Sequence, residues 1–157
     1  MNAYVFDPLR LRRFLLLLAA MLAVSSLAWA DAGPRMATVK VGTHALRVEV
    51  VSTDADRAKG LMHRTSLGAN DGMLFVFDEP AYHSMWMKNT LIPLSVAFID
   101  EAGVILNIAD MKPLTTEAHA AAGFARYALE MNQGWFATNG IRAGAKVLGL
   151  EAAPKPK

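Results

Sequence analysis

Three consecutive polar residues beside a tryptophan could bind a ligand. Lys88, Asn89 and Thr90 offer an ammonium, an amide and a hydroxyl group, and Trp86 offers a flat apolar wall. Pockets combine mostly apolar walls with a few polar groups, so this set predicts a site for a small polar or anionic ligand, which Arg64 could join. The alternative is structural. Asn89 and Thr90 would then form a turn, Lys88 would lie in solvent, and the tryptophan would pack in the core.

A second set of side chains could bind a soft metal ion. His83, Met85 and Met87 occupy alternate positions and would share one face of a strand. Thioethers and an imidazole are ligands for Cu(I), and four further methionines could add to them: Met62, Met73, Met111 and Met131. Methionine also fills gaps in cores, so we expect neither a metal nor another cofactor and keep copper as an alternative. The four histidines form no zinc-binding motif.

Catalytic motifs are missing from the sequence. It contains no G-x-S-x-G motif, no H-E-x-x-H motif and no cysteine. A hydrolase-like acid–base cleft would need Glu117, His119, and Asp100 or Glu130 to meet in space near Lys88 or Asn89. The competing interpretation places the aspartate in a turn and Glu130 in solvent or in an ion pair. The residues therefore leave open whether the protein is an enzyme.

A strand over residues 94–99 is the strongest structural prediction. Both of its alternating sets of side chains are apolar or small: Leu94, Val96 and Phe98 on one side, Ser95, Ala97 and Ile99 on the other. Such a strand is typically covered on both faces. Pro93 and the Asn89-Thr90 pair mark a break before it. The segment that holds the candidate binding residues from Trp86 to Thr90 therefore leads into this strand.

Shorter patterns predict the other elements. We expect a hairpin of strands 37–41 and 45–51, a helix of one or two turns between Thr53 and Gly60, and a short helix at 135–139. Further strands are predicted at residues 73–77, 104–108, 124–131 and 146–150, with a long loop at 112–123. The pattern predicts a mainly β fold, an antiparallel β-sandwich or compact barrel with one or two short helices.

The first 30 residues predict a secretory signal peptide. Three arginines precede an apolar run that begins at residue 14, and Ala28-Trp29-Ala30 fits cleavage after Ala30. The apolar core is short for a membrane span, which needs about 20 residues. We therefore expect a periplasmic or secreted protein without a stable membrane span after cleavage, with an uncleaved anchor as the alternative. Residues 31–36 would form a flexible lead-in, 37–151 a single β-rich domain and 152–157 a disordered tail.

The signal peptide accounts for the excess positive charge. The chain has 16 Lys+Arg and 14 Asp+Glu; residues 1–30 hold three of the former and one of the latter, which leaves 13 of each. A neutral mature chain does not favour nucleic-acid binding, which needs a basic surface. Without cysteine, an exported protein must obtain its stability from core packing. We expect a monomer.

Several motifs resemble one known family, that of the domain of unknown function 192. They are Gly60-Leu61-Met62 with Arg64, Gly72-Met73-Leu74-Phe75, Trp86-Met87-Lys88-Asn89-Thr90 with Ile92-Pro93-Leu94, Phe98-Ile99-Asp100, and Tyr127-Ala128-Leu129-Glu130. The resemblance covers about residues 38–150 and implies a small exported β-rich domain of sandwich type with no established activity. This sequence has Ser95 where the family often has Asp, and its 112–123 loop lacks a cysteine that relatives often carry.

The sequence thus predicts an exported binding module. Its partner would be a small polar or anionic ligand, or a protein of the cell envelope, held by Trp86, Lys88, Asn89, Thr90 and Arg64. A hydrolase-like enzyme and a Met/His copper-binding protein are the alternatives.

Overall fold

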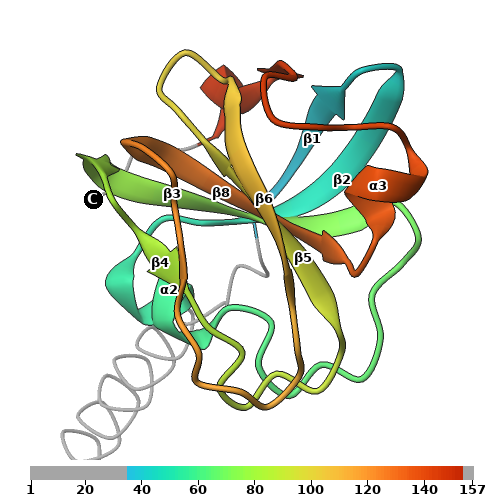
Figure 1. Ribbon diagram of the computed structural model, residues 1–157, viewed down its shortest axis with the longest axis vertical. Coiled ribbons are helices and arrows are strands. Elements are labelled where there is room, and N and C mark those ends of the chain that lie inside the picture. The colour runs from blue at the N-terminus through green and yellow to red at the C-terminus, as the bar shows by residue number, and fades with distance from the viewer. Residues whose placement is uncertain (1–34, 154–157) are drawn as a thin grey trace, which may run out of the picture. The chain divides into compact units, whose positions relative to one another are not determined.

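A curled sheet forms the frame of the protein (Figure 1). The computed structural model describes residues 35–153; the predicted signal peptide, residues 1–30, lies outside them, as do residues 31–34 and 154–157. Within the described residues the elements follow in this order: β1 (Arg35–Val41), β2 (His44–Val51), α2 (Asp54–Lys59), β3 (Asp71–Ala81), β4 (Ser84–Met85), β5 (Leu94–Ile99), β6 (Ile105–Met111), β7 (His119–Ala120), β8 (Ala125–Asn132), α3 (Trp135–Thr138), β9 (Val147–Leu148) and the 3-10 turn η1 (Leu150–Ala152).

The main sheet has the strand order β6-β5-β8-β3-β2-β1-β9, and β4 pairs separately with β7. The predicted mainly β class with short helices is confirmed. One pair, β2 with β3, is parallel, whereas the other named pairs are antiparallel. A parallel pair requires a crossover connection, and residues 52–70 with α2 provide it.

Strand β5 is buried along its whole length, as its sequence predicts. Its two faces contact two separate clusters of buried residues. Ala97 and Ile99 belong to the first core cluster, together with side chains of β1, β2 and α3. Leu94, Val96 and Phe98 belong to the second core cluster, which also contains Leu61 and Met87 among others. Burial of apolar surface on both faces of the sheet is the main stabilising contribution to the fold.

The predicted hairpin is confirmed, because β1 and β2 pair around a turn with Val41 opposite His44. β1 begins at Arg35, two residues before the predicted start and inside the predicted lead-in. β7 was not predicted, because two residues in a polar loop carry no periodic pattern; it forms only by pairing with β4. No helix in the part of the chain that the structure describes is long and apolar enough to cross a membrane.

Candidate functional site

Helix α2 forms one wall of the site, and its ends follow the predicted signals. The Thr53 hydroxyl oxygen accepts a hydrogen bond from the backbone N–H of Asp56 at 3.2 Å, which caps the first turn. The helix ends at Gly60, whose φ of +47° favours glycine. A Cβ atom at Gly60 would lie 3.3 Å from Cζ of Phe75, so glycine also lets the turn pack closely on β3.

A break in the pairing of β3 shapes the opposite side of the site. The register between β3 and β8 shifts between Val76 and Ala81, which marks a β-bulge or irregularity. Pro80 lies in this segment, where its missing N–H costs no ladder hydrogen bond. Bulges change the direction of side chains. Phe77, Asp78 and Glu79 from this segment line the cavity described next.

A cavity of about 410 Å³ lies between α2, the end of β3 and β4. This volume is in the range of small-molecule sites. Helix α2 and β4 also lie close together in Figure 1. The cavity is lined by a mixture of apolar, sulfur-containing, polar and charged residues: Asp54, Arg57, Ala58, Lys59, Gly60, Leu61, Met62, Phe75, Phe77, Asp78, Glu79, His83, Ser84, Met85, Trp86, Thr90 and Glu130. We call this space the α2–β4 cavity.

Glu130 is the most unusual residue of the α2–β4 cavity. It lies on β8 opposite Met73 of β3 and Val96 of β5, both of which are in the second core cluster. Only 3% of Glu130 is exposed, and no group among the described residues hydrogen-bonds its carboxyl. Burial raises the pKa of Glu130 to about 8, because the charged form loses its hydration. Glu130 is therefore mostly protonated at pH 7 and faces a space that a ligand could fill.

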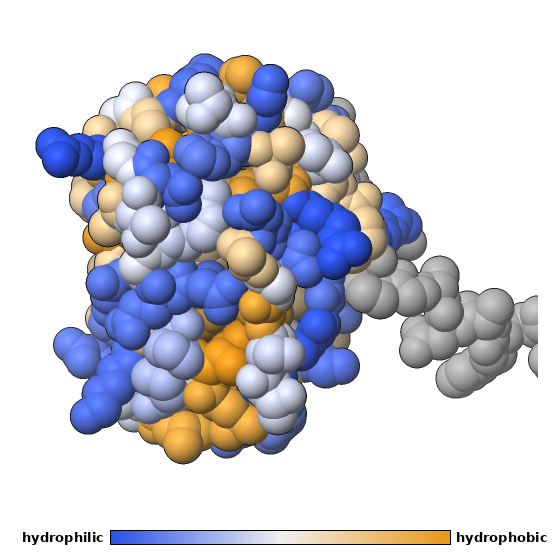
Figure 2. Space-filling view, turned by 90° about the vertical axis from the view of Figure 1, so that its right-hand side faces the viewer, coloured by the Kyte–Doolittle hydropathy of each residue, from blue (hydrophilic) through white to orange (hydrophobic). Residues whose placement is uncertain are grey.

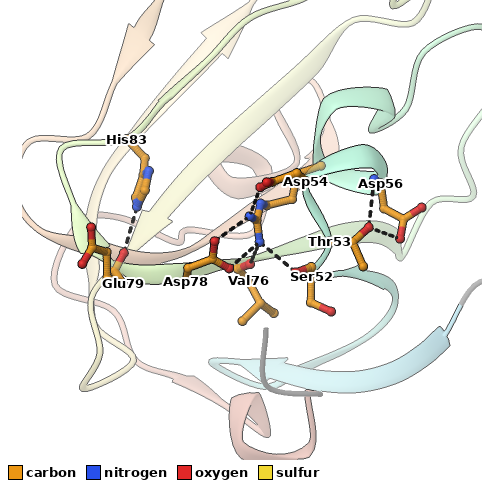
Figure 3. Close-up of polar contacts among 9 residues, drawn as sticks. Ser52, Thr53, Asp54, Asp56, Val76, Asp78, Glu79 and His83 are labelled. Atoms are coloured by element: carbon orange, nitrogen blue, oxygen red, sulfur yellow. Dashed lines mark hydrogen bonds and ion pairs between the residues drawn. The ribbon is translucent and has the colours of Figure 1, made fainter. Parts of the chain in front are cut away.

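Arg57 connects α2 to β3 at the edge of the cavity. Its guanidinium donates to the carboxylates of Asp54 and Asp78 at 2.5 and 3.1 Å, and to the backbone carbonyls of Ser52 and Val76 at 2.8 and 2.9 Å. Figure 3 shows these four groups around one side chain. Burial lowers the pKa of Arg57, but the hydrogen bonds and charges of Asp78 and Asp54 outweigh burial and raise it overall. Arg57 is thus a structural cation that is already neutralised.

His83 is held by two contacts. Its ring stacks on Phe77 with the ring centroids 3.7 Å apart. Its Nε2 lies 2.9 Å from the backbone carbonyl oxygen of Glu79 (Figure 3). A carbonyl oxygen only accepts, so Nε2 carries the proton and a neutral ring would leave Nδ1 as an acceptor.

The structure separates the five predicted ligand-binding residues. Trp86 and Thr90 line the α2–β4 cavity, whereas Lys88, Asn89 and Arg64 do not. Lys88 is exposed, and its Nζ lies 5.4 Å from the centroid of the Trp86 ring. The guanidinium of Arg64 donates to the Glu49 carboxylate at 2.6 Å.

Asn89 and Thr90 also stabilise the turn that follows Trp86. Asn89 has a φ of +55°, and its backbone carbonyl accepts the N–H of His63 at 2.9 Å. The Thr90 N–H donates to the Met87 carbonyl at 3.1 Å, while the Thr90 carbonyl accepts the N–H of Leu114 at 3.1 Å. The structural alternative therefore describes these two residues well, although Thr90 still contributes to the cavity wall.

The copper alternative depended on three side chains that the structure does not bring to one open site. His83 and Met85 line the α2–β4 cavity, but Met87 is fully buried in the second core cluster. Its place beside Leu94 and Phe98 is that of a core side chain. Within residues 35–153, no three His, Asp or Glu side chains gather closely enough to hold a metal ion.

The acid–base alternative retains one of its four residues at the cavity. Glu130 lines it, while Glu117 is exposed and His119 lies on β7 outside the lining. The Asp100 carboxylate accepts the backbone N–H of Val104 at 2.8 Å, which is the turn role that the sequence indicates. The expectation that Glu130 is solvated or ion-paired is wrong, because the strand that carries it is covered on both faces.

Ser95 lies near α3, away from the α2–β4 cavity. Its hydroxyl donates to the Asp110 carboxylate on β6 and accepts the N–H of Gly134 at 2.8 Å. Because Ser95 and Asp110 are opposite each other in the β5–β6 pair, the neighbouring strand supplies the carboxylate that the family resemblance would place at position 95. Ser95 is therefore a structural hydroxyl that connects β5 to β6 and to the start of α3.

Large apolar side chains are also exposed at several places: Met36, Tyr82, Trp86, Leu91, Leu114, Phe124 and Leu148. Tyr82 and Phe124 contact each other with ring centroids 5.0 Å apart. Figure 2 shows one face on which hydrophobic residues gather in the lower part, bordered by hydrophilic ones. Exposed apolar residues are normal on protein surfaces, so these features alone define no site.

The fold and the cavity define a small mainly β protein with a buried acid in a cavity at one side of the sheet. The chain belongs to the domain of unknown function 192 family: the model of this family, DUF192, described as "Uncharacterized ACR", matches residues 37–149. The resemblance noted from the motifs is confirmed. None of the curated proteins compared with the chain matches it.

Two solved structures are similar to this one. A protein of unknown function from Novosphingobium aromaticivorans DSM 12444 is 38% identical, with a TM-score of 0.70 over 76% of this chain and 89% of that chain. A protein from Sinorhizobium meliloti 1021, named as a candidate transcription regulator, is 31% identical, with a TM-score of 0.72 over 76% of this chain and 98% of that chain.

Proposed function

We propose that this protein is a binding module of the cell envelope that holds a small ligand in the α2–β4 cavity. The observation that carries the proposal is the Glu130 carboxyl, which is buried in the cavity without a hydrogen-bond partner among the described residues. Because Glu130 lines the cavity, a ligand held there can contact this carboxyl.

The walls of the cavity support a ligand of modest size. Leu61, Phe75 and Phe77 provide apolar surface, while the Thr90 and Glu130 side chains provide polar groups. Ligand sites combine these two kinds of surface in the same way. The location in the envelope rests on the predicted signal peptide, whose charged start, apolar core and Ala28-Trp29-Ala30 site are typical of exported proteins.

Binding is favoured over catalysis by what surrounds Glu130. General acid–base catalysis at one bond needs a second group within hydrogen-bond reach of the reacting atoms. In the described residues no titratable side chain hydrogen-bonds Glu130. Arg57, a cation that also lines the cavity, is engaged by Asp54 and Asp78. A binding role needs only the cavity and its carboxyl.

Native mass spectrometry of the protein purified gently from the compartment to which it is exported tests this proposal. We expect an additional bound mass on the wild-type protein. The variant Ala58→Trp places a large side chain on the cavity wall and should lose the bound mass. Ala55→Trp on the same helix is the matched control, because Ala55 is exposed and does not line the cavity. A bare protein, or equal loss in both variants, would contradict the proposal.

A further inference from the structure

We infer that the ligand of the α2–β4 cavity is a small organic cation, an ammonium group on an apolar or aromatic body. This inference rests on the proposed function and adds the chemical class of the ligand. It differs from the polar or anionic ligand expected from Lys88, because that side chain lies outside the cavity lining.

The charges around the cavity favour a cation. Four acidic residues line it, Asp54, Asp78, Glu79 and Glu130, against two basic ones, Arg57 and Lys59. Since Glu130 is protonated in the free protein, one negative charge is in excess before a ligand binds, and two are in excess once a bound cation ionises Glu130. Arg57 is already paired with Asp54 and Asp78. Clefts lined mainly by one sign of charge concentrate ions of the opposite sign. An anionic ligand would enter against this excess of negative charge.

Glu130 gives the cation a specific partner. Only 3% of Glu130 is exposed, it lines the cavity, and no hydrogen bond or ion pair within the described residues involves its carboxyl. A buried carboxylate is stable only when a cation or several donors pair with it. An ammonium group in the cavity would supply both the opposite charge and the donors. The acid would then be ionised in the complex.

The apolar part of the wall suits the rest of such a ligand. Phe75, Phe77 and Trp86 are aromatic, and Met62 and Met85 are polarisable thioethers. Cations on aromatic faces are stabilised by the ring quadrupole. Trp86 already takes part in one such contact, with the Lys88 ammonium 5.4 Å from its ring centroid.

Proton release is the distinctive signature of this binding. Burial raises the pKa of Glu130 to about 8, so the free protein holds a proton there at neutral pH. Pairing with a cation favours the ionised form. Binding at pH 7 should therefore release close to one proton, and affinity should rise about tenfold per pH unit below the pKa of the free acid. The other charged or titratable groups that face the cavity are Asp54, Arg57, Lys59, Asp78, Glu79 and His83.

Three probes of similar size and different charge test the inference: benzylammonium, benzyl alcohol and phenylacetate. Binding to the purified protein is followed at pH 7 by NMR chemical shifts, and proton release by calorimetry in two buffers of different ionisation enthalpy. We expect benzylammonium to bind at least tenfold more tightly than the other two. Glu130→Gln should weaken it at least tenfold and abolish the proton release, and Glu130→Met serves as a second neutral variant.

Two controls locate the effect. Glu101→Gln removes an exposed carboxyl from a turn and should change neither affinity nor proton release. Ala58→Trp should block benzylammonium binding, whereas Ala55→Trp should not. Equal or tighter binding of benzyl alcohol or phenylacetate, no binding of benzylammonium, or an unaffected Glu130→Gln variant would overturn the inference. A neutral or anionic molecule bound to the native protein would also overturn it, yet would leave the proposed function intact.

Discussion

Replacement of Glu130 by glutamine should change how stability depends on pH. Glutamine keeps the size of the side chain and cannot ionise. In the wild-type protein, Glu130 has a pKa of about 8 when folded and about 4.3 when unfolded. Between these values the folded state binds the extra proton, so stability falls as pH rises. Below pH 4 both states are protonated, and the contribution of this group is fully present.

The size of the effect follows from the difference in pKa. A folded pKa of about 8 for Glu130 lies roughly 3.7 units above the unfolded value, and each unit corresponds to about 1.36 kcal/mol. The wild-type protein should therefore lose about 5 kcal/mol relative to Glu130→Gln between pH 4 and pH 9. This is a large part of the free energy of unfolding of an ordinary domain, which is roughly 5–15 kcal/mol.

Urea unfolding followed by circular dichroism at several pH values between 4 and 9 measures this difference. We expect the urea midpoints of the wild-type protein and of Glu130→Gln to diverge steadily above pH 5, with Glu130→Gln the more stable at pH 9. The exposed Glu101→Gln variant should follow the wild-type curve. Parallel curves for wild type and Glu130→Gln would refute the argument that burial raises the pKa of this carboxyl.

Three further substitutions, with Lys59→Ala as a control for the first, separate structural from binding roles. Arg57→Ala should destabilise the protein by about 2–4 kcal/mol in urea unfolding, because two carboxylates and two carbonyls lose a charged donor. Lys59→Ala, at an exposed side chain on the rim of the cavity, should cost under about 0.5 kcal/mol in the same assay. Ser95→Ala should cost about 1–2 kcal/mol in thermal unfolding, because the Gly134 N–H loses its acceptor. Trp86→Ala, at a side chain 49% exposed, should weaken benzylammonium binding severalfold in the NMR titration, with little change in stability.

The local elements were predictable because their signals lie within a few residues of each other. Helix α2 begins after Thr53 and ends before Gly60 as expected, since capping depends on neighbouring backbone groups. The strand of residues 94–99 was predictable because two alternating apolar sets leave no polar face for solvent. The register shift in β3 and the pairing of β4 with β7 depend on contacts between distant segments, which leave no local pattern.

The candidate site was predictable only in part for the same reason. Trp86 and Thr90 stand in an unusual local run of residues, and both reach the cavity. Glu130 was considered only as one of several scattered acids. The local pattern gives no signal for its burial, because Arg126, Ala128, Glu130 and Asn132 share one face of the strand and only the alanine is apolar. Its burial depends on the place of β8 between β3 and β5 in the middle of the sheet, which only the fold reveals.

The most direct test of the account is the titration of the Glu130 carboxyl itself. Its side-chain carboxyl carbon can be followed by ¹³C NMR and identified by its absence in Glu130→Gln. We expect it to titrate with a pKa near 8 in the free protein, and at a lower pH when benzylammonium is added. Titration in the range of ordinary glutamates, near pH 4.3, with no response to benzylammonium, would contradict both the burial of an unpaired acid and its role in the cavity.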